Sequence, residues 1–378
     1  MTELDVCLVA HFAFGALGGG ERGHVGGVEH QTSLLARWLA SRGHRISLVT
    51  WDEGQPDGVE IDGVRVYTLC RRDAGLPGLR FVHPRWTSLI AALRRADARI
   101  YYQNCGEYVT GQVALEARRR RRAFVYSVAS DPDCDARLPG LPALRERLLY
   151  RYGLRRADRV IVQTRRQQRL LQEGFGRASV VLPMPCAGPA RDALPPRRLA
   201  PGAPRRVLWI GRLAEVKRPD RLLDVAQACP ELRFDVVGPP EDPAAAAALL
   251  ERARSLANVT YHGRVARDGV AAFYERADAL LCTSEYEGFP NTFLEAWSHG
   301  VPTVSTVDPD GLIAEQGLGA HAPDRDGLAA ALRRLLGSAA LWEQASSRAR
   351  AYFLDHHALD RSLPRFEALF REVAAARA

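Results

Sequence analysis

The stretch RVLWIGRLAEVK, residues 206–217, joins an apolar run to a glycine turn that carries two cations. Residues 206–210 have the composition of a buried strand, and Gly211 follows that strand directly. Arg212 and Lys217 flank the turn, and cations at the carboxyl end of a parallel strand can bracket a diphosphate. Lys217 is the single lysine among 52 basic residues. Either one lysine fell here by chance, or this position needs a compact ammonium instead of a guanidinium.

The same alternation of strand and helix runs through most of the 378 residues. Such alternation predicts an α/β fold of two Rossmann-like domains, each with a parallel sheet covered on both faces. Predicted strands in the first half are 4–12, 45–51, 99–103, 123–128, 159–163 and 179–182. Predicted helices between them are 28–41, 89–98, 111–118, 141–156 and 165–173. Predicted strands in the second half are 206–210, 233–237, 259–261, 279–283 and 303–307.

The domain boundary is expected in residues 183–205, which are rich in Pro, Ala and Arg and lack periodicity. Residues 1–182 and 206–350 then form the two domains. Residues 58–69 contain a D-G dipeptide between β-rich runs and predict a hairpin at a sheet edge. Residues 351–378 are expected to pack back toward the first domain, because the final helix has an apolar stripe. The stripe consists of Leu363, Phe366, Leu369, Phe370 and Val373.

Composition indicates a soluble globular protein, with 47% hydrophobic and 25% charged residues. No run approaches the ~20 apolar residues of a membrane span. The first apolar run, 6–14, lacks a basic n-region and is interpreted as a strand instead of a signal peptide. Seven scattered cysteines without a C-x-x-C indicate a reducing cytoplasm and no zinc site or disulfide framework.

Positive charge is concentrated in the first half, where residues 1–190 hold 28 arginines against 19 acidic residues. This half could suit an anionic membrane face or an acidic acceptor, and no nucleic-acid partner is expected. The helix at 141–156 has Leu141, Leu144, Leu148 and Tyr152 opposite several arginines, so it could lie on a membrane. The alternative is an amphipathic helix whose apolar stripe faces the core, with solvated arginines.

A second ligand loop is expected in SEYEGFPNTFLEAWSHG, residues 284–300. It follows a predicted strand, and a helix is expected to begin near Asn291. Glu287 lies in the loop and Glu295 about one turn into the helix. A loop that doubles back can bring both carboxylates to one ligand beside free helix N–H groups. Alternatively, Glu295 is exposed and Glu287 belongs to a turn.

A third loop, GALGGGERGHVGG at 15–27, contains a formal G-x-G-x-x-G at Gly18, Gly20 and Gly23. The match to a dinucleotide fingerprint is weak, because the loop runs long before the helix. This loop nevertheless supports an alternative function, an NAD(P)-dependent oxidoreductase. That alternative leaves Lys217, Glu287 and Glu295 unexplained.

Together the ordered motifs resemble those of the family 4 glycosyltransferases, enzymes of the two-domain GT-B architecture. The resemblance is dense in 206–307 and loose in 1–180. Segments 26–29, 259–265 and 274–285 also look like family segments. The family pattern G-R-L-x(3)-K and E-G-F-P-x(4)-E-A-x(3)-G-x-P is matched by Gly211, Arg212, Leu213, Lys217, Glu287, Gly288, Phe289, Pro290, Glu295, Ala296, Gly300 and Pro302.

The resemblance implies transfer of a sugar from a nucleotide-diphosphate donor, with retention at the anomeric carbon, in a cleft between the domains. Arg212 and Lys217 would hold the diphosphate, and Glu287 would face the donor sugar. Glu295 would bind the ribose, and the backbone amides of residues 288–291 would contact sugar and phosphate. The full donor-binding set that we predict from the resemblance is Gly26, Gly27, Gly211, Arg212, Lys217, Gly238, Gly263, Arg264, Val265, Gly288, Phe289, Pro290, Asn291 and Glu295.

One departure from the family pattern lies after the strand FVYSV. Ser130 stands where many family members have a histidine, so Asp131 is the remaining candidate to reach sugar or acceptor. Asp131 and Asp133 form a D-x-D, a pattern that binds metal in another glycosyltransferase architecture. With two cations on the diphosphate we expect no metal and no cofactor besides the donor. A non-catalytic glycosyltransferase-like subunit is a further alternative, which the complete second-domain motif set disfavours.

Overall fold

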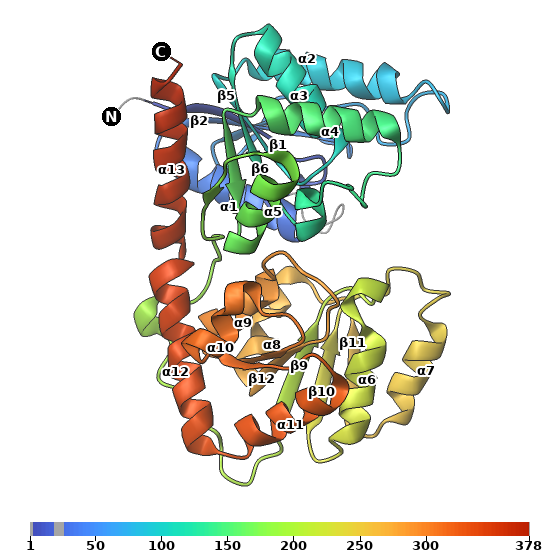
Figure 1. The fold of residues 1–378 in the computed structure, drawn as a ribbon, viewed down its shortest axis with the longest axis vertical. Coiled ribbons are helices and arrows are strands. Elements are labelled where there is room, and N and C mark those ends of the chain that lie inside the picture. Colours follow the sequence, from blue (N-terminus) through green and yellow to red (C-terminus); the bar gives the residue numbers. More distant parts are fainter. Residues whose placement is uncertain (1–2, 19–25, 378) are drawn as a thin grey trace. The chain divides into compact units, whose positions relative to one another are not determined.

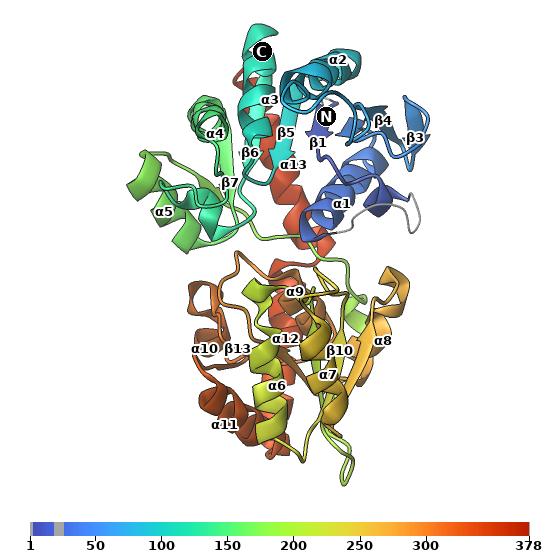
Figure 2. The same cartoon turned by 90° about the vertical axis from the view of Figure 1, so that its right-hand side faces the viewer.

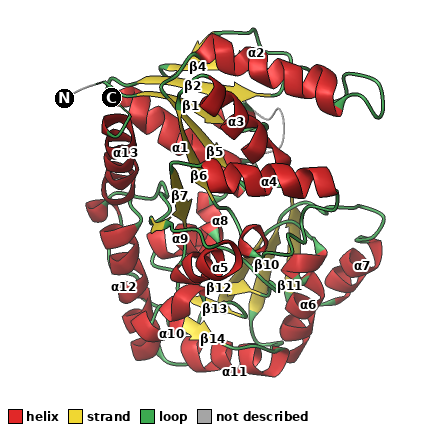
Figure 3. Ribbon diagram, turned by 45° about the horizontal axis from the view of Figure 1, so that its top comes forward, coloured by secondary structure: helices red, strands yellow, loops and turns green. Residues whose placement is uncertain are grey.

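The computed structural model describes residues 3–18 and 26–377, which form two compact units (Figure 1). The first unit combines Met1–Pro185 with Leu359–Ala378, and the second is Cys186–Ala358. Each is a sheet surrounded by helices (Figure 3). The segment 186–205 therefore belongs to the second unit. The expected tail 351–378 divides between the units at Leu359.

The first unit contains an eight-stranded sheet in the order β3-β4-β2-β1-β5-β6-β7-β8. Every strand pair is parallel except β3 and β4, the antiparallel hairpin predicted from residues 58–69. All residues of β5 and β6 are buried, since helices cover both faces of a parallel sheet. The strands are β1 Asp5–Val9, β2 Arg45–Thr50, β3 Val59–Ile61, β4 Val64–Thr68, β5 Ile100–Asn104, β6 Ala123–Ser127, β7 Arg159–Val162 and β8 Val180–Val181.

Two groups of helices build two cores on this sheet. One core contains residues of α2, α3, α4 and α5, and the other contains residues of α1 and α13. The whole apolar stripe predicted for the final helix is buried in the second of these cores. The helices are α1 Gly27–Ser41, α2 Thr87–Ala96, α3 Tyr108–Arg119, α4 Leu144–Arg156, α5 Arg165–Phe175 and α13 Leu359–Ala375, with short turns η1 Gly15–Leu17, η2 Phe81–Trp86 and η3 Asp131–Cys134.

The second unit contains a six-stranded sheet in the order β11-β10-β9-β12-β13-β14, with every pair parallel. Its strands are β9 Arg206–Ile210, β10 Arg233–Val237, β11 Val259–Gly263, β12 Ala279–Cys282, β13 Thr303–Ser305 and β14 Gly319–His321. Its helices are α6 Pro219–Ala228, α7 Ala247–Ser255, α8 Ala271–Arg276, α9 Asn291–Ser298, α10 Leu312–Gln316, α11 Arg325–Leu336 and α12 Ala339–His356. Its short turns are η4 Arg191–Ala193, η5 Glu215–Lys217, η6 Arg267–Gly269 and η7 Pro309–Gly311.

The orientation of α4 bears out the core-face interpretation of the stripe for Leu141, which is buried just before the helix, and for Tyr152, which packs against the core. It contradicts that interpretation for Leu144 and Leu148. Leu144 and Leu148 are 69% and 56% exposed. The buried residues of the helix are Tyr150, Gly153 and Leu154. Gly153 decides this orientation, because a Cβ there would lie 2.5 Å from the backbone of Thr110 in α3. Only the bare glycine face lets the two helices approach so closely.

Candidate functional site

Four loops of the second unit meet at the carboxyl edge of its sheet. They follow β9, β10, β11 and β12, which are neighbours in the sheet order. These loops carry the predicted residues Gly211, Gly238 and Glu287, and the predicted Gly263 is the last residue of β11. Open parallel sheets bind ligands at this edge, where loops lead into helices. The structure thus brings the donor-binding residues predicted from the second half to one edge.

The loops after β9 and β10 are in backbone contact. The Gly211 N–H donates to the Val237 carbonyl at 3.0 Å, and the Gly238 N–H donates to the Gly263 carbonyl at 2.8 Å. Gly238 has a φ of +137°. A Cβ at Gly238 would overlap the Gly211 carbonyl oxygen and lie 2.7 Å from its carbon. Glycine is required here, because a side chain would displace the turn that carries the two cations.

Lys217 and Glu287 form an ion pair across this edge. Their side chains are 28% and 15% exposed, so the pair is largely withdrawn from water. The hydroxyl of Ser284 donates to the same Glu287 oxygen at 2.6 Å. The hydroxyl of Thr283 donates to the Lys217 carbonyl at 2.8 Å and fixes the backbone beneath the ammonium. The indole N–H of Trp209 donates in turn to Thr283 at 2.9 Å.

Glu295 lies in α9, as predicted, but it is not exposed. Its carboxylate pairs with Arg267 at 2.5 Å and accepts a hydrogen bond from the Tyr274 hydroxyl at 2.8 Å. Burial, with the nearby Glu295 charge, holds the pKa of Tyr274 well above its usual value. Tyr274 therefore stays protonated and donates. The two glutamates have separate partners, so their carboxylates are oriented independently.

Arg212 pairs with Glu241 in the loop after β10. Both side chains are about half exposed, at 49% and 52%, so water competes for both charges. Exposed pairs of this kind contribute little to stability. The Arg212 guanidinium can consequently be turned to another anion at small cost. Arg264 is exposed, and Val265 is half-buried beneath Gly269.

The start of α9 corrects one expectation about residues 288–291. Pro290 is the residue before the helix and has no backbone N–H, so it cannot donate to sugar or phosphate. The side chain of Phe289 is buried against Trp297 and His357, at ring distances of 6.1 and 5.2 Å. Phe289 therefore anchors the loop, and the amides left to donate are those of residues 288, 289 and 291.

The predicted residues of the first unit lie in other loops. Gly26 and Gly27 begin α1, where Glu29 accepts the Gly26 N–H at 3.0 Å. Of the glycines behind the oxidoreductase alternative, Gly18 ends η1, and Gly20 and Gly23 lie outside the described residues. Asp131 begins η3.

The carboxylates of the D-x-D are held by protein groups. Asp131 pairs with Arg166 at 3.0 Å and accepts from Gln167 at 3.2 Å. One oxygen of Asp133 accepts three backbone N–H groups, from residues 106, 129 and 130, at 3.1–3.3 Å. Residues 3–18 and 26–377 contain no group of three or more His, Cys, Asp or Glu side chains arranged to hold a metal. These contacts fix both carboxylates in the loop after β6, and a role of Asp131 toward sugar or acceptor stays a prediction.

Glu107 follows β5 at the carboxyl edge of the first sheet, and no motif pointed to it. Its carboxylate lies 3.9 Å from Nδ1 of His11, which follows the neighbouring strand β1. Burial, with the charges of Asp133 and Glu29, raises the pKa of Glu107 to about 7. Burial also lowers the pKa of His11 to about 4, helped by Arg85. Near neutral pH this edge holds a neutral imidazole beside a carboxyl group that gives up its proton at a higher pH than usual.

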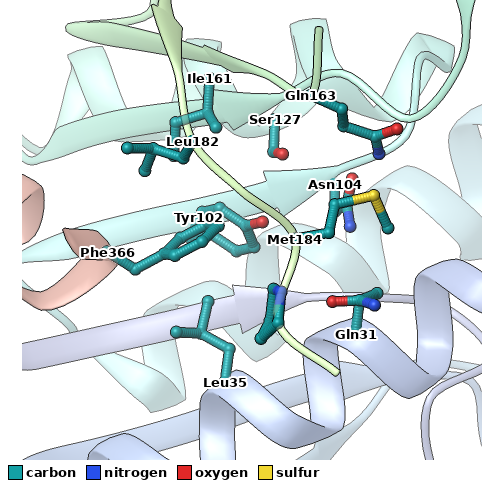
Figure 4. Close-up of a pocket in the computed structure, with 11 residues that line it drawn as sticks. Gln31, Leu35, Tyr102, Asn104, Ser127, Ile161, Gln163, Leu182, Met184 and Phe366 are labelled. Carbon is teal, nitrogen blue, oxygen red and sulfur yellow. The ribbon is translucent and has the colours of Figure 1, made fainter. Parts of the chain in front are cut away.

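A small cavity of about 20 Å³ opens at the same edge, on the side of α1 and α13 (Figure 4). Amide and hydroxyl groups point into it from the ends of adjacent strands, and Phe366 and Leu35 close it (Figure 4). The Oδ1 atom of Asn104 is buried and has no hydrogen-bond partner in the described structure. The cavity wall is mostly apolar, and with the polar groups that it carries, a cavity of this size can hold one water or a hydroxyl group. Its polar lining consists of Gln31, Tyr102, Asn104, Ser127 and Gln163.

Several residues that complete the site were not predicted. Ser284 stands three residues before Glu287 in the quoted loop, so its position was visible but carried no weight. Arg267 and Tyr274 reach Glu295 from η6 and α8. Nothing in their local sequence indicates that contact, because it depends on the arrangement of separate elements.

Two family descriptions match the chain in consecutive parts. Residues 26–187 match the "Glycosyl transferase 4-like domain" and residues 204–338 match "Glycosyl transferases group 1". The D-inositol 3-phosphate glycosyltransferase of Kineococcus radiotolerans is 28% identical over 387 residues, covering 87% of this chain and 88% of that protein. The mannosylfructose-phosphate synthase of Agrobacterium fabrum is 35% identical over 128 residues, covering 31% of this chain and 28% of that protein.

Solved structures show the same architecture. Sucrose-phosphate synthase from Thermosynechococcus elongatus aligns with a TM-score of 0.79 at 20% identity, over 99% of this chain and 100% of that chain. HepE of Anabaena, solved with UDP and glucose, aligns with a TM-score of 0.74 at 15% identity, over 98% and 100%. The two parallel-sheet units therefore have the GT-B fold, which confirms the predicted architecture. The family matches give no support to the oxidoreductase alternative.

Proposed function

The chain belongs to the family 4 glycosyltransferases, and we propose that it moves a sugar from a nucleoside-diphosphate donor to an acceptor with retention at the anomeric carbon. The observation that carries this proposal is the Lys217–Glu287 pair at the carboxyl edge of the second sheet. A half-buried cation whose backbone is held in place suits a diphosphate, and the adjacent carboxylate suits sugar hydroxyls.

Each donor-site residue has a proposed role. Lys217 and Arg212 bind the diphosphate. The Arg212 guanidinium can leave its exposed partner Glu241 to do so. Glu287 accepts hydrogen bonds from the donor sugar, and Glu295 accepts from the ribose. Ser284 holds the carboxylate of Glu287, and Arg267 holds that of Glu295. These separate partners support distinct positions for the two carboxylates along one extended ligand. The second unit thus binds the donor, and the first unit binds the acceptor.

The chemical step replaces one C–O bond at the anomeric carbon with another. The acceptor hydroxyl oxygen forms the new bond while the bond to the diphosphate breaks, and the hydroxyl proton leaves with the diphosphate. Negative charge grows on the departing diphosphate, so cations already fixed at that place lower the barrier. Lys217 is the best placed of these, since Thr283 holds its backbone.

Metal independence and a cytoplasmic location are further parts of the proposal. Two cationic side chains take the place of a divalent ion on the diphosphate, so transfer is expected to survive EDTA. Full loss of activity with EDTA, restored by Mg²⁺ or Mn²⁺, would contradict this. All seven cysteines are free, which suits a reducing compartment. No helix in the described part of the chain is long and apolar enough to span a bilayer.

Donor binding is tested by thermal unfolding of the whole protein with UDP, GDP, ADP and TDP, and with NAD(P) for comparison. A ligand that binds only the native state raises the melting temperature by mass action. At least one nucleoside diphosphate should raise it, and Lys217→Gln should remove the rise while the exposed control Arg254→Gln keeps it. A rise with NAD(P) alone would refute the proposal. Binding without transfer to any acceptor in a panel would favour the non-catalytic subunit.

A further inference from the structure

The largest exposed apolar side chains of the first unit gather in two segments. One is the loop that leads into η2, with Leu76 and Leu79, together with Val82 in η2 itself, and the other is the start of α4. The exposed fractions are 69% for Leu76, 65% for Leu79 and 56% for Val82, and 69% and 56% for Leu144 and Leu148. We call these five residues the leucine patch. Isolated exposed apolar side chains are common on protein surfaces, but four leucines and a valine in two adjacent segments indicate a binding surface.

The two segments are held together by side-chain contacts. The Arg145 guanidinium lies 4.5 Å from the ring centre of Phe81, which begins η2. Phe81 also packs against Tyr108, the first residue of α3, with ring centres 5.1 Å apart. In Figures 1 and 2 the start of α4 and the approach to α2 project on the same side of the first unit. The patch therefore lies beside the carboxyl edge of the first sheet, which α3 follows.

The loop presents its leucines through ordered backbone structure. The N–H groups of Leu79 and Arg80 both donate to the Leu76 carbonyl, at 3.1 and 2.9 Å. The guanidinium of Arg85 donates to the Arg72 carbonyl at 2.8 Å and ties the loop to η2. The leucines thus lie on a closed turn with their side chains in water. A binding partner that covers them would remove this apolar surface from water, which is favourable.

Charge identifies the partner. Residues 71–86 and 144–156 contain nine arginines and two acidic residues. Arg80, Arg145, Arg151 and Arg155 are exposed or half-buried around the leucines. Apolar side chains that enter an acyl layer, with arginines that reach back to headgroups, are the pattern of an interfacial membrane site. A protein partner would need many matching carboxylates, whereas an anionic lipid surface supplies negative charge everywhere.

We propose that the leucine patch docks the first unit on an anionic lipid membrane. The acceptor would then be carried by that membrane as a lipid-linked saccharide, and this second part rests on the proposed glycosyl transfer. The patch lies beside the sheet edge that holds Glu107 and His11, and this position supports a membrane-borne acceptor. Docking itself needs no catalysis, so it can be tested independently of the enzyme reaction.

The test is co-sedimentation of the whole protein with vesicles of equal parts phosphatidylglycerol and phosphatidylcholine, and with phosphatidylcholine alone. The wild type should bind the anionic vesicles and release them at high salt, because screening weakens the arginine contribution. The double variant Leu144→Gln/Leu148→Gln should bind at least about tenfold more weakly, since it loses two inserted side chains. The matched control is Leu341→Gln, an exposed leucine of the second unit (40%) that should bind as the wild type does.

Further variants distinguish membrane docking from a general attraction between opposite charges and from self-association. Arg80→Gln/Arg155→Gln should weaken binding more than the control pair Arg254→Gln/Arg334→Gln, whose arginines are exposed in the second unit. All these variants should keep the wild-type melting temperature and donor-induced stabilisation, because the changed side chains are exposed. Wild-type binding by the leucine variant, or no binding by the wild type, would overturn the proposal. A dimer that the leucine variant dissolves, without vesicle binding, would show a protein interface instead.

Discussion

Replacing Lys217 by arginine keeps the charge and changes only its shape. The ammonium occupies a restricted place, because it shares the Glu287 oxygen with Ser284 and Thr283 holds the backbone beneath it. A guanidinium is wider and must shift by about 1 Å, a displacement that can cost on the order of 100-fold in rate. We expect kcat/KM to fall by about ten- to a thousand-fold, or about 1.4–4 kcal/mol of transition-state stabilisation. Stability should barely change, because Glu287 keeps a cationic partner.

The assay is steady-state transfer with the donor that stabilises the protein best, together with a thermal melt of each variant. Arg254→Lys, an equal exchange at an exposed position, should keep wild-type kinetics. Lys217→Gln should lower both activity and stability, since it leaves the largely buried Glu287 without its cation. A near-wild-type kcat/KM in Lys217→Arg would show that only charge matters at this position and that the lone lysine arose by chance.

Three further predictions concern other groups. Glu287→Gln should lower kcat more than it raises donor KM, whereas Glu295→Gln should mainly raise donor KM; unchanged kinetics in both variants would make the two glutamates structural. Gly238→Ala should lower the melting temperature by several degrees and weaken donor binding, because φ strain of about 1–3 kcal/mol adds to the overlap with the neighbouring turn; an unchanged melt would refute this. The pKa of Glu107 is raised from 4.5 to about 7 in the folded state. As pH rises between these values, Glu107 loses its proton in the unfolded state first, so the free energy of unfolding falls. Glu107→Gln should remove that part of the pH dependence in urea titrations, and a difference curve that is flat between pH 4.5 and 7 would contradict the burial argument.

The strand and helix pattern was largely predictable, because it depends on local periodicity. The boundaries predicted for β9 and β10 agree with the structure at both ends. The start of α9 at Asn291 and the burial of the apolar stripe on α13 also agree. β14 was missed, since Gly319–His321 is too short to show a period of two.

The candidate site was predictable to the extent that it follows strand ends. Parallel neighbours bring their carboxyl ends together, so motifs after separate strands had to meet once the sheet formed. Lys217 and Glu287, 70 residues apart, pair for this reason. The lack of an N–H in Pro290 was also readable from the sequence, and the expectation that it would donate was an error of chemistry.

The sequence by itself determined which segments become strands, which loops carry charge, and which side chains are chemically suited to a diphosphate and a sugar. Only the tertiary structure decided that Arg267 and Tyr274 hold Glu295, and that Leu144 and Leu148 face solvent. The physical reason is that periodicity shows that a helix has an apolar face but not which face meets its neighbour. In α4 the close approach at Gly153 turns the face of Tyr150 and Leu154 toward the core, and Leu144 and Leu148 remain in solvent.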